Sequence, residues 1–197
     1  MLTDPAAVAV HGLRCNSLGN LGRLAVVGAG VVGLLTALYA DSLGWQVTIL
    51  GRNGVTLFRP DDPVPSVRSS PKTSAMQASF DVVVDAASGA DSAPLELALW
   101  LVTDGGTIIV QNAYHPAVGL PIPLRDIFRR SIRLVGSFSY CRRGDDDFEV
   151  ALRLLRSHAA TVERYATRVA GIEGLQTAIN DDAIRLIRRV LAIGDRR

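Results

Sequence analysis

Short runs of consecutive apolar residues alternate along the chain with segments that predict helices. The run at residues 24–27 contains no polar position, which is typical of a parallel-sheet strand covered on both faces. Gly28 ends this run, and the next segment predicts a helix at 31–42 that ends near Gly44. The same reading predicts strands at 46–50, 80–86, 107–111 and 131–138, a weaker strand at 55–58, and helices at 5–14, 94–102, 124–130 and from 145–147 to about residue 158.

The order of these elements predicts an α/β protein with a Rossmann-type, doubly wound parallel sheet, because strands and helices alternate. The pattern weakens between residues 54 and 79, where closely spaced prolines from Pro60 to Pro71 exclude a helix of useful length. We therefore expect the third strand and its helix to be shortened or missing.

Acidic residues stand at the starts of two predicted helices. Asp4 is predicted to be the N-cap of the first helix, with Pro5 at the first helical position. Residues 145–147 place carboxylates where the dipole of the next helix favours them. Further along, residues 173–179 predict a short helix, and residues 183–193 are apolar with interspersed arginines.

Composition is that of an ordinary globular domain. The chain has 197 residues, of which 48% are hydrophobic and 20% charged. Its 21 basic and 19 acidic residues leave a net charge of +2, which argues against binding nucleic acid through bulk electrostatics. The apolar, uncharged run at residues 24–40 is shorter than the ~20 residues of a membrane span and contains glycines, so we expect no membrane segment.

The cysteines and histidines predict structural roles. Cys15 and Cys141 are too few for a disulfide framework or a four-cysteine zinc site, and we expect both as small, half-buried hydrophobes in a reducing cytoplasm. No basic region precedes the first apolar stretch, as it would in a signal peptide. His11, His115 and His158 are widely separated, which predicts packed or solvated side chains rather than metal ligands.

A glycine motif stands at the first strand–helix junction. Residues 26–33 read VVGAGVVG, which is G-x-G-x-x-G between a strand and a helix. The first glycine permits the tight turn, the second leaves space for a pyrophosphate, and the third lets helix and strand pack closely. The motif predicts dinucleotide binding at the helix start, and the alternative is a packing turn that has lost its ligand. The residues predicted to contact the cofactor here are Gly28, Gly30, Val31, Val32 and Gly33.

The residues after the second strand bear on the choice between NAD and NADP. An NAD site places Asp or Glu about 20 residues after the loop, whereas Gly51, Arg52 and Asn53 occupy that place here. A guanidinium can hold a 2′-phosphate by two hydrogen bonds, and a carboxylate that would repel it is missing. This favours NADP(H), with NAD as the second choice, and the alternative is that Arg52 is an ordinary turn residue in solvent.

Other catalytic sets find little support. The only lysine, Lys72, has no tyrosine at the spacing of a short-chain dehydrogenase, and the chain lacks the G-x-S-x-G and G-K-[ST] motifs. Asp81 and Asp85 lie at opposite ends of one predicted strand, so we do not expect them to act as an acid/base pair.

Six segments follow one another along the chain: DPAAVAVHGL, GRLAVVGAGVVGLLTALYADSLGWQVTILGRN, FDVVVDAASG, LVTDGGTIIVQNAY, PIPLRDIFRRSIRLVGSFSY and DDDFEVALRLLRSH. Their order resembles the coenzyme domain of the medium-chain dehydrogenase/reductase family, the zinc-type alcohol dehydrogenase superfamily, and within it the sorbitol and threonine dehydrogenase branch. The resemblance covers most of the chain, from about Asp4 to Ile193. It implies three groups of cofactor contacts at strand ends. The first group lies beside the adenosine and ribose and comprises Ala86, Ala87 and Ser88. The second lies near the nicotinamide carboxamide, largely through backbone groups, and comprises Gln111, Asn112 and Ala113, and the third closes that end and comprises Ser137 and Phe138.

Members of this family begin with a catalytic domain that carries zinc ligands, and the resemblance implies that this chain starts where that domain ends. We expect residues 1–19 to be a hinge-helix remnant, 20–144 the dinucleotide-binding domain, and 145–197 a C-terminal helix and return segment. Asp4 alone cannot hold zinc, which needs about three protein ligands, so we expect no zinc. The catalytic residues are unknown, and another chain or another part of a longer product would supply them.

Three functions are compatible with these observations. The chain is an NADP(H)-dependent oxidoreductase acting on an alcohol or carbonyl substrate, a non-catalytic dinucleotide-binding module, or a degenerate remnant that binds nothing. The resemblance also implies a homodimer through the edge strand at 132–138, because family members pair their coenzyme domains edge to edge. Such pairing would satisfy the unpaired backbone groups of two sheet edges at once.

Overall fold

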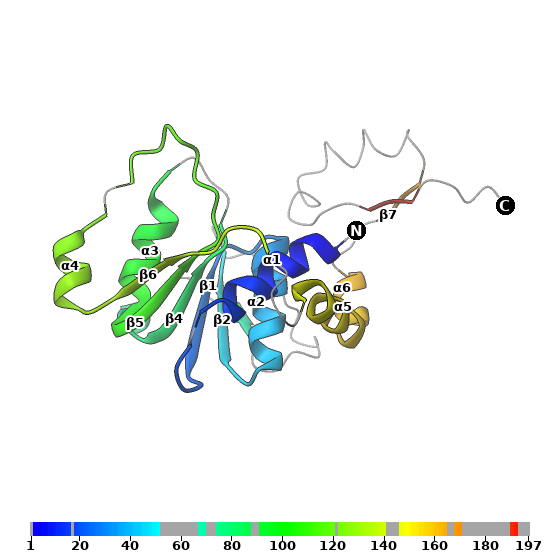
Figure 1. Cartoon of the computed structure of the whole chain (residues 1–197), viewed down its shortest axis with the longest axis horizontal. Coiled ribbons are helices and arrows are strands. Elements are labelled where there is room, and N and C mark those ends of the chain that lie inside the picture. The colour runs from blue at the N-terminus through cyan, green and yellow to red at the C-terminus, as the bar shows by residue number, and fades with distance from the viewer. Residues whose placement is uncertain are drawn as a thin grey trace.

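A six-stranded parallel sheet forms the centre of the molecule, with strand order β3-β2-β1-β4-β5-β6 (Figure 1). The structure is a computed structural model that describes residues 2–16, 18–51, 67–69, 74–87, 91–120, 122–140, 146–164, 168–170 and 190–192. The strands of the sheet are β1 (Arg23–Val27), β2 (Gln46–Leu50), β3 (Val67–Ser69), β4 (Phe80–Asp85), β5 (Val102–Val110) and β6 (Arg133–Gly136). The helices are α1 (Thr3–Arg14), α2 (Val31–Ser42), α3 (Ala93–Leu101), α4 (Leu124–Arg129), α5 (Asp147–Ser157) and α6 (Ala159–Arg164), with a short 3-10 helix at Ser74–Met76.

This strand order confirms the predicted doubly wound Rossmann-type fold. The chain moves outward from β1 through β2 to β3 and then returns to the other side of β1 with β4, so the topological switch point lies at β1. The third strand is present but shortened to three residues, as expected from the proline-rich segment. The weaker strand predicted at 55–58 lies outside the described residues.

Alternate residues of the strands face two separate hydrophobic cores. Leu24 and Val26 of β1 pack with α1, α2 and α5, whereas Ala25 and Val27 pack with α3. Figure 1 shows α1, α2 and α5 on one face of the sheet and α3 on the other. All four side chains are buried. The apolar run at 24–27 therefore reflects a strand covered on both sides, and each large side chain buried in this way contributes about 1.5–3 kcal/mol to folding.

The start of α1 and the bounds of β6 differ from the predictions. The N-cap of α1 is Leu2, whose carbonyl accepts from the Ala6 N–H at 2.9 Å, so the prediction that Asp4 caps this helix was wrong. The strand predicted at 131–138 shortens to β6, since Ser131 has a left-handed φ of 52° that a strand cannot hold.

The C-terminal part contains elements that the sequence analysis did not predict. Helix α6 follows α5, and β7 (Arg168–Ala170) pairs in parallel with β8 (Val190–Ala192). The short helix predicted at 173–179 lies outside the described residues. Among the helices that the structure describes, none is both long and apolar enough to cross a bilayer.

Candidate dinucleotide site

Gly28 occupies the sharp turn that follows β1. Its φ of +110° is a conformation that other residues rarely adopt. A Cβ atom at this position would lie 2.6 Å from the backbone nitrogen of Ala87, at the end of β4. Both conformation and space therefore require glycine, as the motif predicts.

The other two glycines of the motif differ in their surroundings. A Cβ on Gly33 would lie 1.9 Å from the carbonyl oxygen of Gly28, so α2 can approach the end of β1 only without a side chain there. A Cβ on Gly30 would meet nothing within 4 Å. The packing of this chain therefore does not require glycine at position 30, and the open space beside it is where a ligand could approach the backbone.

The start of α2 is suited to an anion. Gly30 is the N-cap and offers no side-chain cap, and the first turn contains no acidic residue. The first hydrogen bond of the helix runs from the Leu34 N–H to the Gly30 carbonyl at 2.9 Å, so the N–H groups of residues 31–33 have no acceptor within the helix. These donors and the positive end of the helix dipole fit a diphosphate.

Backbone hydrogen bonds bring the ends of β2 and β4 to this turn. The Gly28 N–H donates to the Leu50 carbonyl and the Ala86 N–H donates to the Val27 carbonyl, both at 2.9 Å. The predicted contacts Gly51, Ala86 and Ala87 therefore lie on either side of the glycine turn. Predicted contacts Arg52, Asn53 and Ser88 lie outside the described residues.

The ends of β5 and β6 continue the same edge of the sheet. The Gln111 N–H donates to the Asp85 carbonyl, and the Ser137 N–H donates to the Val110 carbonyl, both at 2.9 Å. Ser137 is buried, yet its hydroxyl has no hydrogen-bond partner in the described part of the chain. A buried, unpartnered hydroxyl at this edge fits a polar group of a bound cofactor. Ala113 and Phe138 are exposed, and Phe138 is 92% accessible.

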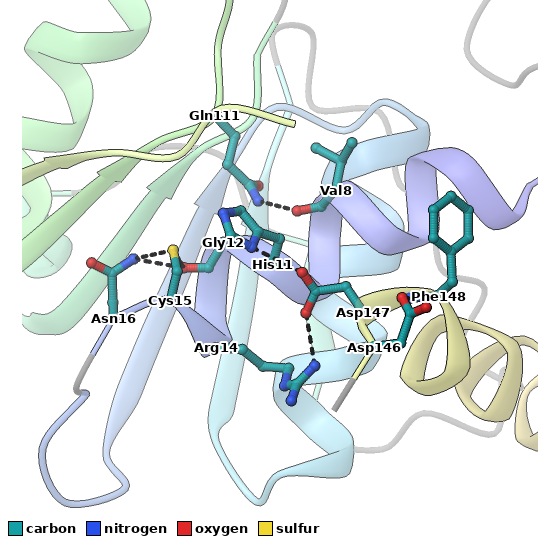
Figure 2. Close-up of polar contacts among 10 residues, drawn as sticks. All are labelled: Val8, His11, Gly12, Arg14, Cys15, Asn16, Gln111, Asp146, Asp147 and Phe148. Atoms are coloured by element: carbon teal, nitrogen blue, oxygen red, sulfur yellow. Dashed lines mark hydrogen bonds and ion pairs between the residues drawn. The ribbon is translucent and has the colours of Figure 1, made fainter. Parts of the chain in front are cut away.

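The side chain of Gln111 is committed to the fold. Its amide nitrogen donates to the Val8 carbonyl of α1 at 2.9 Å (Figure 2). Its oxygen accepts from the Thr36 hydroxyl at 3.2 Å. A Cβ on Gly12 would lie 2.0 Å from that nitrogen, so Gly12 provides the space for the contact. This leaves the backbone groups of Gln111 for a cofactor contact, which stays a prediction.

Asp85 and Tyr114 form a buried pair that the sequence analysis did not place in the site. The Tyr114 hydroxyl donates to Asp85 Oδ2 at 2.6 Å, and the Ala87 N–H donates to Oδ1 at 3.2 Å. Burial raises the pKa of the Asp85 carboxyl, and hydrogen bonds from Tyr114 and Ala87 act in the opposite direction. Burial and the neighbouring Asp85 raise the pKa of Tyr114. The sequence signal that could have placed Asp85 in the site was a carboxylate at the end of a predicted buried strand of the parallel sheet.

A second polar cluster joins α1 to α5. Asp147 is buried, and its carboxylate accepts from Arg14 Nη1 at 2.7 Å and lies 3.0 Å from His11 Nδ1 (Figure 2). Asp146 caps α5 by accepting from the Phe148 N–H at 2.9 Å, which confirms the predicted role of this acidic run. His11 is therefore a packed side chain, as predicted. Cys15 is exposed, so the expectation that it is half-buried was wrong, and Cys141 lies outside the described residues. Among the residues described, no group of histidine, cysteine and carboxylate side chains could hold a metal ion.

Comparisons with known proteins relate the chain to polyol dehydrogenases. D-altritol 5-dehydrogenase of Agrobacterium fabrum is 34% identical over 148 residues, which are 72% of this chain and 44% of that protein. Sorbitol dehydrogenase of Rattus norvegicus is 23% identical over 192 residues, which are 90% of this chain and 52% of that protein. The chain spans about half the length of the curated relatives it matches. No family model matches it.

Solved structures show the same fold. Acetophenone reductase from Geotrichum candidum, solved with NAD, matches with a TM-score of 0.63 and 20% identity over 85% of this chain and 46% of its own. S. aureus TarJ, solved with NADPH, matches with a TM-score of 0.66 and 16% identity over 92% of this chain and 59% of its own. Fold, glycine turn and polyol dehydrogenase relatives agree: the chain belongs to the medium-chain dehydrogenase/reductase family and matches its coenzyme-binding domain.

Proposed function

We propose that the chain is the coenzyme-binding part of an NADP(H)-dependent oxidoreductase that acts on alcohol or carbonyl substrates. The observation that carries this proposal is the turn from Gly28 to Gly33. Packing requires glycine at positions 28 and 33. Gly30 instead borders open space at the start of α2, where the first turn contains no acidic residue. When bound, a nicotinamide cofactor supplies the hydride chemistry, and this chain holds and orients it. Polyols are the first substrates to test, because the named relatives act on them.

A preference for NADP(H) rests on the residue types that follow β2. Arg52 stands where an NAD site has a carboxylate, and it offers two donors to a 2′-phosphate. One of the matching solved structures holds NADPH and the other NAD, so the fold accommodates both cofactors. Arg52→Ala is expected to weaken NADPH binding by about 10- to 100-fold, the value of one charge-assisted contact, and to leave NADH binding nearly unchanged. Equal losses for the two cofactors would contradict the preference.

The proposed enzyme has further parts. Residues 1–19 act as the hinge into a catalytic domain, residues 20–144 bind the cofactor, and residues 145–197 are a C-terminal helix and return segment, of which α5 lies against the hinge helix. The contact of α1 with α5 supports the last assignment. Substrate contacts and any zinc come from a catalytic domain. We place the enzyme in the cytoplasm, where its two cysteines stay reduced.

The sheet edge supports a homodimer through β6. This strand lies at the end of the sheet, and it presents Leu134 together with Leu124 and Phe128 of the adjacent α4 to solvent. Phe128 is 83% accessible, which is costly for a large apolar side chain on a monomer of this size. A second copy across a two-fold axis would cover these residues.

Cofactor titration tests the proposed function. NADPH and NADH are titrated into the wild-type chain and into Gly30→Ala, with nicotinamide fluorescence as the readout. Gly119→Ala is the matched control, because a Cβ there also meets nothing within 4 Å. We expect Gly30→Ala to weaken binding at least tenfold and Gly119→Ala to leave it unchanged. Failure of the wild type to bind either nucleotide, or equal binding by the two variants, would refute the proposal.

A further inference from the structure

Asp85, a buried carboxylate, and Tyr114, a half-buried phenol, lie between two parts of the proposed cofactor site. Asp85 is the last residue of β4, and its side chain is fully buried. Its Oδ1 accepts from the Ala87 N–H at 3.2 Å, within the turn that closes on Gly28. Its Oδ2 accepts from Tyr114, on the loop that follows β5, at 2.6 Å. One carboxylate therefore fastens the turn after β4 to the loop after β5.

Such a pair is hard to explain as a contribution to stability. Burying a carboxylate carries a large desolvation penalty, which a hydrogen bond to a neutral phenol offsets only in part. The raised pKa of Asp85 reflects this imbalance. A polar pair kept in the core at the carboxyl edge of a parallel sheet is instead typical of groups that shape a ligand site.

We propose that Asp85 and Tyr114 are positioning residues for the dinucleotide, which hold the turn at residues 86–87 and the loop after β5 in the geometry that the cofactor requires. This inference rests on the proposed function. The ionised carboxylate is the effective form, because it accepts from both donors at once. When Asp85 takes up a proton, one of its oxygens becomes a hydroxyl donor and the contact on that oxygen weakens. The turn after β4 or the loop after β5 is then held less firmly, and the cofactor binds more weakly.

Few ionisable groups surround Asp85, so a pH-dependent change in cofactor binding can be assigned to its carboxyl group. The residues paired with it on the neighbouring strands are Val27 and Val110, which carry no charge. Its carboxylate accepts from Tyr114 and Ala87, and Tyr114 is the titratable group of the two. The Tyr114 bond lowers the pKa of Asp85, so its removal raises that pKa. Cofactor binding should then fail at a higher pH than in the wild type.

The experiment measures cofactor affinity against pH in the full 197-residue chain. NADH and NADPH are titrated between about pH 5 and 8.5 into wild type, Tyr114→Phe and Asp85→Asn. NADH is the primary probe, since the 2′-phosphate of NADPH itself titrates near pH 6. Tyr39→Phe is the matched control, because it removes a phenol hydroxyl from α2, away from the glycine turn. Thermal unfolding of each variant verifies that it folds.

We expect Tyr114→Phe to weaken NADH binding about fivefold at pH 7 and to move the acid limb of the binding profile to higher pH. Asp85→Asn should flatten that limb, and Tyr39→Phe should reproduce the wild type. If Asp85→Asn does not fold, Tyr114→Phe decides. Weaker binding without a shifted limb, or a profile equal to that of Tyr39→Phe, overturns the inference while the proposed function stands. Absence of binding by the wild type overturns both.

Discussion

Replacing Asp147 by asparagine should destabilise the contact between α1 and α5 through loss of charge alone. The carboxylate is buried and serves Arg14 at 2.7 Å and His11 at 3.0 Å. Asparagine has nearly the same shape and keeps an acceptor oxygen, so it creates no cavity. The change therefore isolates the electrostatic part of the contact.

The magnitude follows from the two contacts. Charge-assisted hydrogen bonds contribute about 1.5–3 kcal/mol each and neutral ones about 0.5–1.5, so the loss over two bonds is about 2–3 kcal/mol. The Arg14 side chain is 25% accessible, and partial screening by water places the expected value near the lower end. The partly buried Arg14 and His11 would face a neutral amide in the variant, so a value near zero would be inconsistent with this geometry.

The matched control is Glu149→Gln. Glu149 is an exposed carboxylate in the same first turn of α5, so its loss reports the interaction with the helix dipole, about 0.3–1 kcal/mol. Urea unfolding at pH 7, followed by the fluorescence of buried Trp45, gives the free energy of unfolding of each variant. We expect Asp147→Asn to lose about 2 kcal/mol more than Glu149→Gln. Equal losses would refute the view that this pair fastens α1 to α5.

Three further predictions address the site, the assembly and the metal. Gly33→Ala should lower stability and abolish NADPH binding together, because its Cβ would lie 1.9 Å from the Gly28 carbonyl oxygen, and a wild-type melting curve would contradict this packing. Light scattering of the wild type should give about twice the chain mass. Leu134→Asp should give a monomer, since it places a charge on the exposed β6 edge. A wild type that remains monomeric at high micromolar concentration would count against the dimer. Metal analysis of the purified chain should find less than one zinc per chain, because the described residues contain no ligand cluster, and one bound equivalent would disprove it.

Local sequence signals were sufficient for the fold and for the centre of the site. The apolar run at 24–27 predicts a strand covered on both faces because each alternate side chain has its own core to enter. The glycine motif predicts the turn because φ at Gly28 and the space at Gly33 are constraints within a few residues. The boundaries of β6 were less predictable, since they depend on the backbone conformation of Ser131.

The polar pairs were decided by the tertiary structure. His11 and Asp147 are 136 positions apart, and Gln111 and Val8 are 103 apart, so no local pattern connects them. Asp85 reads along the chain as the polar end of a strand, and only the pairing of β4 with β5 brings the loop that carries Tyr114 to it. Periodicity and turn chemistry are properties of neighbouring residues, and the sequence by itself therefore determined the elements and the glycine turn. Which side chains share a buried hydrogen bond depends on how those elements pack, and only the folded chain decides it.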